Sequence, residues 1–261
     1  MSELPVTDLL NLSGKSAVVT GAGRGIGAAI ARRLAEAGAA VVVNFRASAE
    51  GASAVAREIH DAGGTAVGMQ ADVTRLDEVE RLMAGAIGLH GGLDILINNA
   101  GIYPVSTLLE MPEEEWDAVV DANLKSVHLC TQVAAARMTQ LGGGGAIVNI
   151  ASIEGHSPAP MHAHYDAAKA GVIMHTRSAA QELGPHGIRV NAVSPGLIHA
   201  EGLEENWPEG VARWLAAAPL GRVGRPVEVA DACLFLASPA AAWITGAVLP
   251  VDGGVLARPA F

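Results

Sequence analysis

Three residues between positions 152 and 169 have the types and the spacing needed to move a proton to or from a substrate oxygen. Tyr165 and Lys169 are four residues apart among helix formers, so their side chains point the same way from successive turns. An ammonium beside a phenol favours the phenolate and lowers the phenol pKa towards working pH. Ser152 follows the apolar run 146–151, a predicted buried strand, and its hydroxyl can bind the same oxygen. The pattern predicts a tyrosine acid/base.

The same spacing also occurs in surface helices, where Tyr165 and Lys169 would be an exposed pair and Ser152 a helix cap. The surrounding elements decide between these interpretations. From Ser16 onwards, short aliphatic runs alternate with amphipathic segments, which predicts βα units on a parallel sheet in one α/β domain over residues 1–261. The expected strands are Ala17–Thr20, Ala40–Asn44, Ala66–Gln70, Leu93–Asn98, Ala146–Ile150, Arg189–Val193 and Val248–Val251.

The amino-acid composition limits the kinds of molecule and surface that the protein is expected to bind. Half of the 261 residues are hydrophobic and only 17% are charged, which is enough apolar material for a large core. The net charge is −10 and no Lys/Arg cluster stands out, so no nucleic-acid or membrane surface is expected. The N-terminal residues lack the features of a signal peptide, and no apolar run reaches the roughly 18 residues that span a bilayer. With Cys130 and Cys233 interpreted as reduced core side chains, these features predict a cytoplasmic protein.

A glycine-rich turn follows the first expected strand and opens a helix over residues 26–37. The turn contains Gly21, Gly23, Arg24, Gly25, Ile26 and Gly27. Glycines at this place let the backbone turn tightly and approach a pyrophosphate at the helix N-terminus. The strand–turn–helix context favours a dinucleotide site over a turn without a ligand.

The end of the second expected strand bears on the choice between NAD and NADP. An Asp or Glu there would bind the ribose 2′-hydroxyl of NAD. The sequence instead has Asn44, Phe45 and Arg46. Arg46 and Arg24 can hold a 2′-phosphate, which a guanidinium binds well; the alternative is two solvated arginines. The prediction is NADP(H), with NAD(H) possible.

Together these motifs resemble the short-chain dehydrogenase/reductase family in its single-domain form. The resemblance covers residues 14–254 and lies nearest the subgroup of β-ketoacyl carrier-protein reductases, sugar dehydrogenases and carbonyl reductases. It is carried, in this order, by Thr-Gly-x3-Gly-x-Gly at 20–27, Asn-Asn-Ala-Gly at 98–101, Ser152 with Tyr165-x3-Lys169, Pro195-Gly196, and the Ile-Thr-Gly-x3-Pro-Val-Asp-Gly-Gly run at 244–254.

The resemblance implies a doubly wound Rossmann-type sheet of seven parallel strands, with helices on both faces and the cofactor at the carboxyl ends of the strands. Tyr165 would be the general acid/base, Ser152 would orient the substrate oxygen, and Lys169 would bind the nicotinamide ribose and lower the phenol pKa. Asn123 would hold a water that links Lys169 to solvent. The other implied cofactor contacts are Asp72 and Val73 at the adenine, Asn99 near the ribose, Ile198 at the carboxamide, and Asn44, Ala100, Gly101, Pro195 and Gly196.

The segment 199–218 matches the family's variable substrate loop. Ala200 stands where relatives usually have a threonine that touches the cofactor, which puts one hydrogen bond in doubt. Two tryptophans of this segment, Trp207 and Trp214, either cap a substrate pocket or pack a short helix.

Two polar residues near Tyr165 are expected to contact the substrate. Glu154 and His162 would border the pocket, where a carboxylate favours a polar, hydroxylated or cationic substrate group. The alternative for Glu154 is a loop carboxylate bonded to backbone amides. No metal is expected at His156, His162 and His164, because the segment has no cysteine and the family chemistry needs no metal.

The expected function is NADP(H)-dependent interconversion of a carbonyl and a secondary alcohol on a small molecule. The alternatives are an NAD(H)-preferring sugar or polyol dehydrogenase, a β-ketoacyl thioester reductase and a non-catalytic cofactor-binding protein. Family analogy implies a homotetramer, paired through helices over 112–140 and 164–183 and through the last helix and strand. The C-terminal residues 258–261 would reach a neighbouring subunit.

Overall fold

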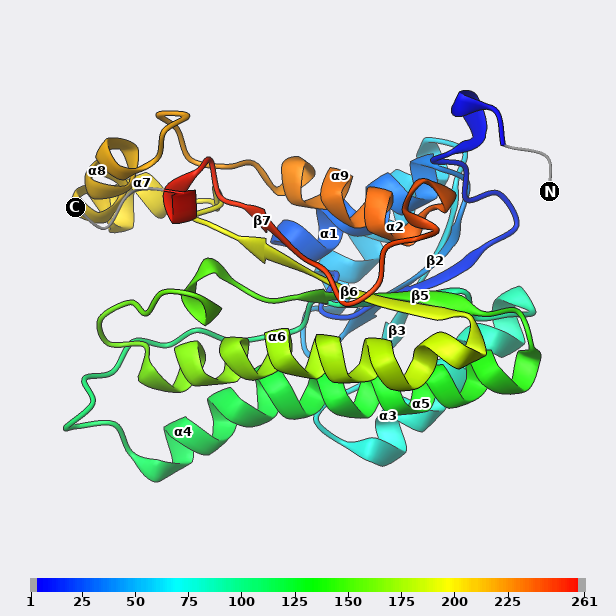
Figure 1. Cartoon of the computed structure of the whole chain (residues 1–261), viewed down its shortest axis with the longest axis horizontal. Helices are drawn as coiled ribbons and strands as arrows, with labels where there is room; N and C mark the ends of the chain where they lie inside the picture. Colours follow the sequence, from blue (N-terminus) through cyan, green and yellow to red (C-terminus); the bar gives the residue numbers. More distant parts are fainter. Residues whose placement is uncertain (1–3, 258–261) are drawn as a thin grey trace.

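The computed structural model describes residues 4–257 and contains one sheet of seven parallel strands, in the order β3-β2-β1-β4-β5-β6-β7 (Figure 1). The strands are β1 (Ser16–Val19), β2 (Ala40–Phe45), β3 (Thr65–Gln70), β4 (Ile95–Asn98), β5 (Gly145–Ile150), β6 (Ile188–Pro195) and β7 (Val248–Val251). Each lies where a strand was expected, which confirms the predicted α/β architecture. The expected subunit contact of residues 258–261 lies outside the described residues.

Helices cover both faces of the sheet. They are α1 (Gly25–Glu36), α2 (Ala49–Asp61), α3 (Leu76–His90), α4 (Glu113–Val120), α5 (Ser126–Leu141), α6 (Ala163–Leu183), α7 (Leu203–Asn206), α8 (Pro208–Ala217) and α9 (Pro226–Ala237). In Figure 1, α1, α2 and α9 lie on one side of the sheet, and α3, α5 and α6 lie on the other. Within residues 4–257, no helix is both long and apolar enough to cross a membrane.

The core has two layers because the strands are apolar on both faces. Val41 and Val43 of β2 pack with Ile30 and Leu34 of α1, whereas Val42 points into the cluster on the opposite face. All five side chains are fully buried. Burial of each contributes roughly 1.5–3 kcal/mol, so the continuous aliphatic run is itself the reason for a central parallel strand.

Parallel pairing places the carboxyl ends of all strands at one edge of the sheet. The glycine turn follows β1, residues 99–101 follow β4, Ser152 follows β5, and Gly196 follows β6. The strand order reverses between β1 and β4, and such a reversal leaves a crevice outside the strand ends. The segments with candidate chemistry therefore come to one edge.

The helix predicted to start at Pro112 contains an interruption that the sequence did not indicate. Between α4 and α5, residues Asp121–Lys125 form a π-helical turn. Such turns occur mostly as single insertions at functional sites. The side chain of Asn123 lies in this turn and is fully buried.

Candidate active site at the carboxyl edge of the sheet

Tyr165, Lys169 and Ser152 meet beside the end of β5. The Lys169 Nζ lies 5.4 Å from the centre of the Tyr165 ring. It donates a 2.8 Å hydrogen bond to the carbonyl of Ile150, the last residue of β5. Ser152 Oγ accepts a hydrogen bond from the Glu154 backbone at 3.1 Å and so caps the short turn Ile153–Gly155. Lys169 and Ser152 are both buried, so an exposed surface pair is excluded.

The expected lowering of the tyrosine pKa is wrong for the described residues. Burial raises the pKa of Tyr165, and the charge of Glu154 raises it further, while a hydrogen bond with Ser152 acts in the opposite direction. Burial also lowers the pKa of Lys169 to about 8, because the charged ammonium loses hydration. Desolvation of the two groups depends on tertiary packing, so the four-residue spacing of Tyr165 and Lys169 does not predict it.

Asn123 and Lys169 converge on Gly101. The Asn123 Nδ2 donates to the carbonyls of Ile102 at 2.7 Å and Val119 at 3.0 Å, while its Oδ1 is buried with no hydrogen-bond partner within residues 4–257. A Cβ added at Gly101 would clash with this Oδ1 and would lie 3.9 Å from the Lys169 Nζ. An orphaned acceptor near an ammonium fits a bridging water.

The glycine turn presents an open helix end. Arg24 at the N-cap of α1 makes no side-chain capping bond, so among residues 4–257 the first amide groups of this helix have no side-chain partner. Gly25 has φ +57°, and an added Cβ there would meet nothing within 4 Å. Gly27, in contrast, packs so closely that a Cβ would lie 2.6 Å from the Gly21 carbonyl oxygen. The turn therefore combines tight packing with a helix N-terminus that its N-cap side chain does not cover, which fits a cofactor pyrophosphate.

The residues after β4 brace this turn. The Asn99 Nδ2 donates to the carbonyls of Thr20 at 2.9 Å and Gly21 at 3.1 Å. The Thr20 hydroxyl accepts hydrogen bonds from the backbones of Asn99 and Ala100. These bonds explain the Asn-Ala-Gly sequence in structural terms, because they join the two loops at the strand-order reversal.

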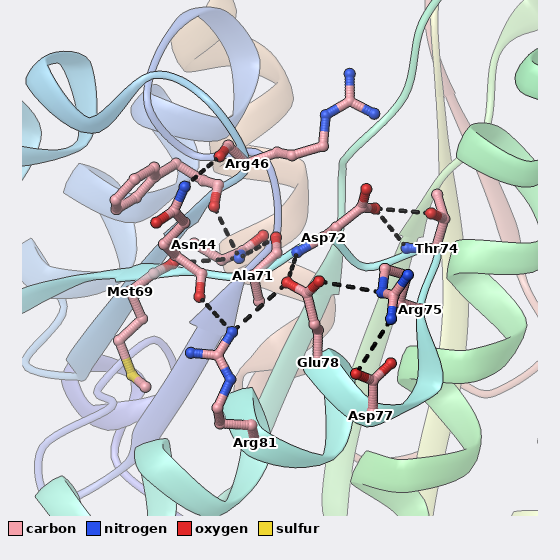
Figure 2. A network of polar contacts seen from close by, with 12 residues as sticks. Asn44, Arg46, Met69, Ala71, Asp72, Thr74, Arg75, Asp77, Glu78 and Arg81 are labelled. Atoms are coloured by element: carbon pink, nitrogen blue, oxygen red, sulfur yellow. Dashed lines mark hydrogen bonds and ion pairs between the residues drawn. The ribbon is translucent and has the colours of Figure 1, made fainter.

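Figure 2 shows the region expected to discriminate between NAD and NADP. Asn44 is buried, and its Nδ2 donates to the carbonyls of Met69 at 3.2 Å and Ala71 at 3.1 Å. Its Oδ1 accepts from the Gly21 backbone. The Asn44 side chain therefore holds the turn in place and offers no free donor to a cofactor. The exposed Arg46 guanidinium extends away from these bonds.

Glu78 is a residue of this region that the sequence analysis missed. Its Oε2 accepts a 2.8 Å hydrogen bond from the Asp72 backbone, and its carboxylate pairs with Arg75 and Arg81 (Figure 2). The Asp72 carboxylate accepts from the Thr74 hydroxyl at 2.7 Å. Burial acts to raise the pKa of Asp72, but the hydrogen bonds from Thr74 and the charges of two arginines outweigh it, so the pKa is lowered. Only the fold brings the Glu78 side chain back to the end of β3.

Glu154 and His162 lie together near Tyr165. The His162 Nδ1 is 2.8 Å from the Glu154 Oε2, and the His162 ring centre is 5.8 Å from that of Tyr165. Glu154 raises the pKa of His162. Tyr103, which the sequence did not indicate, packs on Tyr165 in an edge-to-face arrangement with ring centres 6.4 Å apart.

The segment 199–218 folds as two short helices, α7 and α8, at the carboxyl edge (Figure 1). Trp214 packs on Gly196, the residue after β6. Trp207 is half-exposed and lies against Gly210 and Arg213 of α8. The packing alternative for the tryptophans therefore agrees with these contacts.

The remaining expected contacts lie along the same edge. Pro195 ends β6, and Ile198 forms a single bridge with Gly224. Val73 is buried beside Asp72 at the end of β3. Within the described part of the chain, no group of three His, Cys, Asp or Glu residues is arranged to hold a metal ion.

Comparison with known proteins identifies the relatives of this architecture. The family model described as enoyl-(acyl carrier protein) reductase matches residues 21–256. The chain is 44% identical to a 3-oxoacyl-(acyl-carrier-protein) reductase of Staphylococcus aureus, over 92% of this chain and 98% of the relative. It is also 44% identical to an L-rhamnose 1-dehydrogenase (NAD(P)(+)) of Azotobacter vinelandii, over 92% and 96%.

A solved structure gives the same result. A short-chain type dehydrogenase/reductase from Mycobacterium marinum superposes with a TM-score of 0.91 at 42% identity, covering 98% of this chain and all of the other. The sequence match and the sheet order agree over nearly the whole chain. The protein belongs to the short-chain dehydrogenase/reductase family, whose members are oxidoreductases that act on carbonyl and alcohol groups.

Proposed function

We propose that the protein is an NADP(H)-dependent oxidoreductase that interconverts a carbonyl and a secondary alcohol on a small molecule, with Tyr165 as the acid/base. The observation that carries this proposal is the convergence of Tyr165 and Lys169 with Ser152 and Asn123 beside the open N-terminus of α1. The Asn123 Oδ1 is buried at the same place and has no hydrogen-bond partner within residues 4–257. Neither a surface pair nor a packing cluster would account for such a buried acceptor.

Each side chain has a distinct part in this reaction. A bound nicotinamide supplies or accepts the hydride. Tyr165, whose pKa is raised, is protonated at neutral pH and donates its proton to the carbonyl oxygen as that oxygen gains charge. Ser152 hydrogen-bonds the same oxygen. Lys169 and Asn123 hold the ribose and a water, through which the phenol regains its proton.

The preference for NADP(H) rests on two exposed arginines. Arg24 precedes α1 and Arg46 follows β2, and no acid stands at the end of β2 to bind a ribose 2′-hydroxyl. No ion pair engages either guanidinium within residues 4–257, so both are available to a 2′-phosphate. The rhamnose dehydrogenase relative is named for both cofactors, which keeps NAD(H) as the alternative.

The relatives name two substrate classes. One acts on 3-oxoacyl thioesters of a carrier protein and the other on a sugar. We favour a small ketone, sugar or polyol, because the net charge of −10 opposes docking of an acidic carrier. Thioester reduction and cofactor binding without turnover are the alternatives.

The proposal includes a cytoplasmic homotetramer. Cys130 and Cys233 are unpaired and buried, as in a reducing compartment. The sheet ends at β7, and Trp243 before this strand is fully exposed, which favours a subunit contact there.

The test is a spectrophotometric screen of NADPH and NADH oxidation with ketones, aldehydes, sugar lactones and β-keto esters. Turnover of a carbonyl compound by the wild type, and its loss in Tyr165→Phe with cofactor affinity close to normal, is the expected result. Cofactor binding without turnover of any compound would favour the non-catalytic alternative. Retention of most of the wild-type kcat in Tyr165→Phe would overturn the role of Tyr165.

A further inference from the structure

Glu154 is an acidic side chain held in a defined position beside the reacting phenol. The His162 Nδ1–H donates to its Oε2 at 2.8 Å, and the Glu154 side chain retains 24% of its exposure. The ring of this donor lies 5.8 Å from the Tyr165 ring, and the charge of Glu154 adds to the effect of burial in raising the pKa of Tyr165. A carbonyl oxygen bound to Tyr165 would therefore bring its neighbouring carbon atoms towards Glu154.

His162 is itself fixed by its surroundings. It precedes α6, and its carbonyl accepts a 2.8 Å hydrogen bond from the backbone of Asp166. Its side chain is only 17% exposed and lies against the Tyr165 ring. One Glu154 oxygen is thus held by a rigid donor, which fixes the direction of the carboxylate.

A second carboxylate, that of Asp166, adds negative charge to the surroundings of Glu154 and Tyr165. Asp166 follows Tyr165, and burial together with Glu154 raises the pKa of Asp166 to about 6. The Asp166 Oδ2 accepts from the Ala159 backbone at 3.2 Å, while its Oδ1 is buried and has no hydrogen-bond partner within residues 4–257. An anionic substrate group would meet two carboxylates here, whereas a hydrogen-bond donor would be stabilised.

The chemistry of the neighbouring substrate carbon follows from this environment. A carboxylate that loses water against a methylene group gains nothing in return, and the desolvation opposes binding. A hydroxyl or ammonium on that carbon replaces the lost water with a charge-assisted hydrogen bond. A 3-oxoacyl chain has only methylene groups beside its ketone, so it does not match Glu154.

We propose that Glu154, oriented by His162, is a specificity-determining residue that selects carbonyl substrates with a hydrogen-bond donor on the adjacent carbon and rejects those with a carboxylate there. The inference rests on the proposed function, because it places the carbonyl oxygen at Tyr165. It assigns the substrate to the α-hydroxy or α-amino carbonyl compounds rather than to simple ketones or 3-oxoacyl chains.

The experiment compares four phenyl ketones of the form PhCO–CH2–X that differ only in X: 2-hydroxy-1-phenylethanone, 2-amino-1-phenylethanone, propiophenone and benzoylacetate. The wild type is expected to give a kcat/KM for the hydroxy or the amino ketone at least roughly tenfold above that for propiophenone, with benzoylacetate lowest. The ratio of the first two distinguishes a hydroxyl from an ammonium.

The variants separate the role of Glu154 from general damage. Glu154→Gln keeps the shape and removes the charge, so the ratio of kcat/KM for the hydroxy or amino ketone to that for propiophenone should fall about tenfold. His162→Gln should weaken the preference less. Asp61→Asn, at the exposed end of α2, makes the same type of change away from the site and serves as the control.

The outcomes distinguish the two proposals. Unchanged substrate ratios in Glu154→Gln, with activity that still depends on Tyr165, would overturn the role of Glu154 and leave the proposed reaction standing. A wild type that prefers propiophenone would overturn the substrate class. Turnover of other carbonyl compounds but of none of these four ketones would overturn the substrate class alone. Absence of turnover with every compound, in this set and in the wider screen, would overturn both.

Discussion

The Lys169 Nζ lies 5.4 Å from the centre of the Tyr165 ring, yet it donates its hydrogen bond to the carbonyl of Ile150 at 2.8 Å. The ammonium is therefore held by the end of β5 rather than by the phenol. It is 4% exposed, and burial lowers its pKa to about 8 from a usual value of 10.5. Keeping the charged Lys169 ammonium in this buried position lowers the stability of the folded state.

Lys169→Met should change the pH dependence of stability. Between about pH 8 and 10.5 the unfolded wild-type chain binds more protons at Lys169 than the folded chain, so the free energy of unfolding of the wild type should rise with pH. The gain relative to Lys169→Met should reach about 3 kcal/mol at most. Denaturant unfolding of both proteins at pH 7.5 and pH 10.5 measures it. Parallel pH profiles would show that Lys169 is not desolvated.

The fold was accessible from the sequence because its signals are local. Continuous aliphatic runs such as 41–43 specify buried parallel strands, and the spacing of Gly21 and Gly27 specifies a tight turn before a helix. The same is true of the four-residue spacing of Tyr165 and Lys169, which helix geometry converts into proximity.

The contacts that the sequence did not indicate join distant segments. Glu115 and His164 are 49 positions apart and meet only because α4 packs near the start of α6. Glu78 reaches the end of β3 in the same way. The π-helical turn around Asn123 has no local signal either, since its residues also suit an α-helix. Burial, and hence the pKa of Tyr165, also depends on such packing.

Arg46→Asp should change the cofactor preference. The wild type is expected to have a higher kcat/KM with NADPH than with NADH, because the Arg46 guanidinium is available to a 2′-phosphate. The variant replaces this charge with a carboxylate that repels the phosphate and accepts from a ribose hydroxyl, so the ratio should fall by roughly 10- to 100-fold. Steady-state kinetics with both cofactors measure the ratio.

Arg57→Asp, which makes the same charge change on an exposed position of α2, is the control and should leave the ratio unchanged. If the wild type prefers NADH, or if Arg46→Asp retains the original ratio, the proposed role of Arg46 in binding the 2′-phosphate is wrong.

His164 is expected to position the backbone of Tyr165. Its side chain is fully buried, and its Nδ1 accepts a 2.8 Å hydrogen bond from the Tyr165 N–H. The ring proton therefore lies on Nε2, which donates to the Glu115 Oε1 at 3.3 Å. His164→Leu leaves both partners unsatisfied and should cost about 2–3 kcal/mol of stability and lower kcat.

The conservative variant separates hydrogen bonding from packing. In His164→Asn, the side-chain oxygen can replace Nδ1 as the acceptor, so this variant should keep more of the wild-type kcat than His164→Leu. Thermal unfolding and kcat at saturating substrate measure the two effects. Equal loss of kcat in both variants would show that the volume of the ring matters and its hydrogen bond does not.

The assembly prediction concerns the edge of the sheet at β7. This strand pairs only with β6 in the described chain, and Trp243, which precedes it, is 100% exposed. An uncovered apolar edge is removed when it meets its symmetry mate in an isologous contact. A second exposed apolar surface lies on α6, where Met174 is 61% exposed among small residues that allow close helix approach. Two independent contacts of this kind build a tetramer.

Light scattering at micromolar concentration should therefore give about four times the chain mass of 26.6 kDa for the wild type. Trp243→Glu places a charge in the β7 contact and should give about two times the chain mass. Met174→Glu should likewise yield dimers through the remaining contact. A monomeric wild type would defeat the proposal, and a tetrameric Trp243→Glu would show that the β7 edge is not an interface.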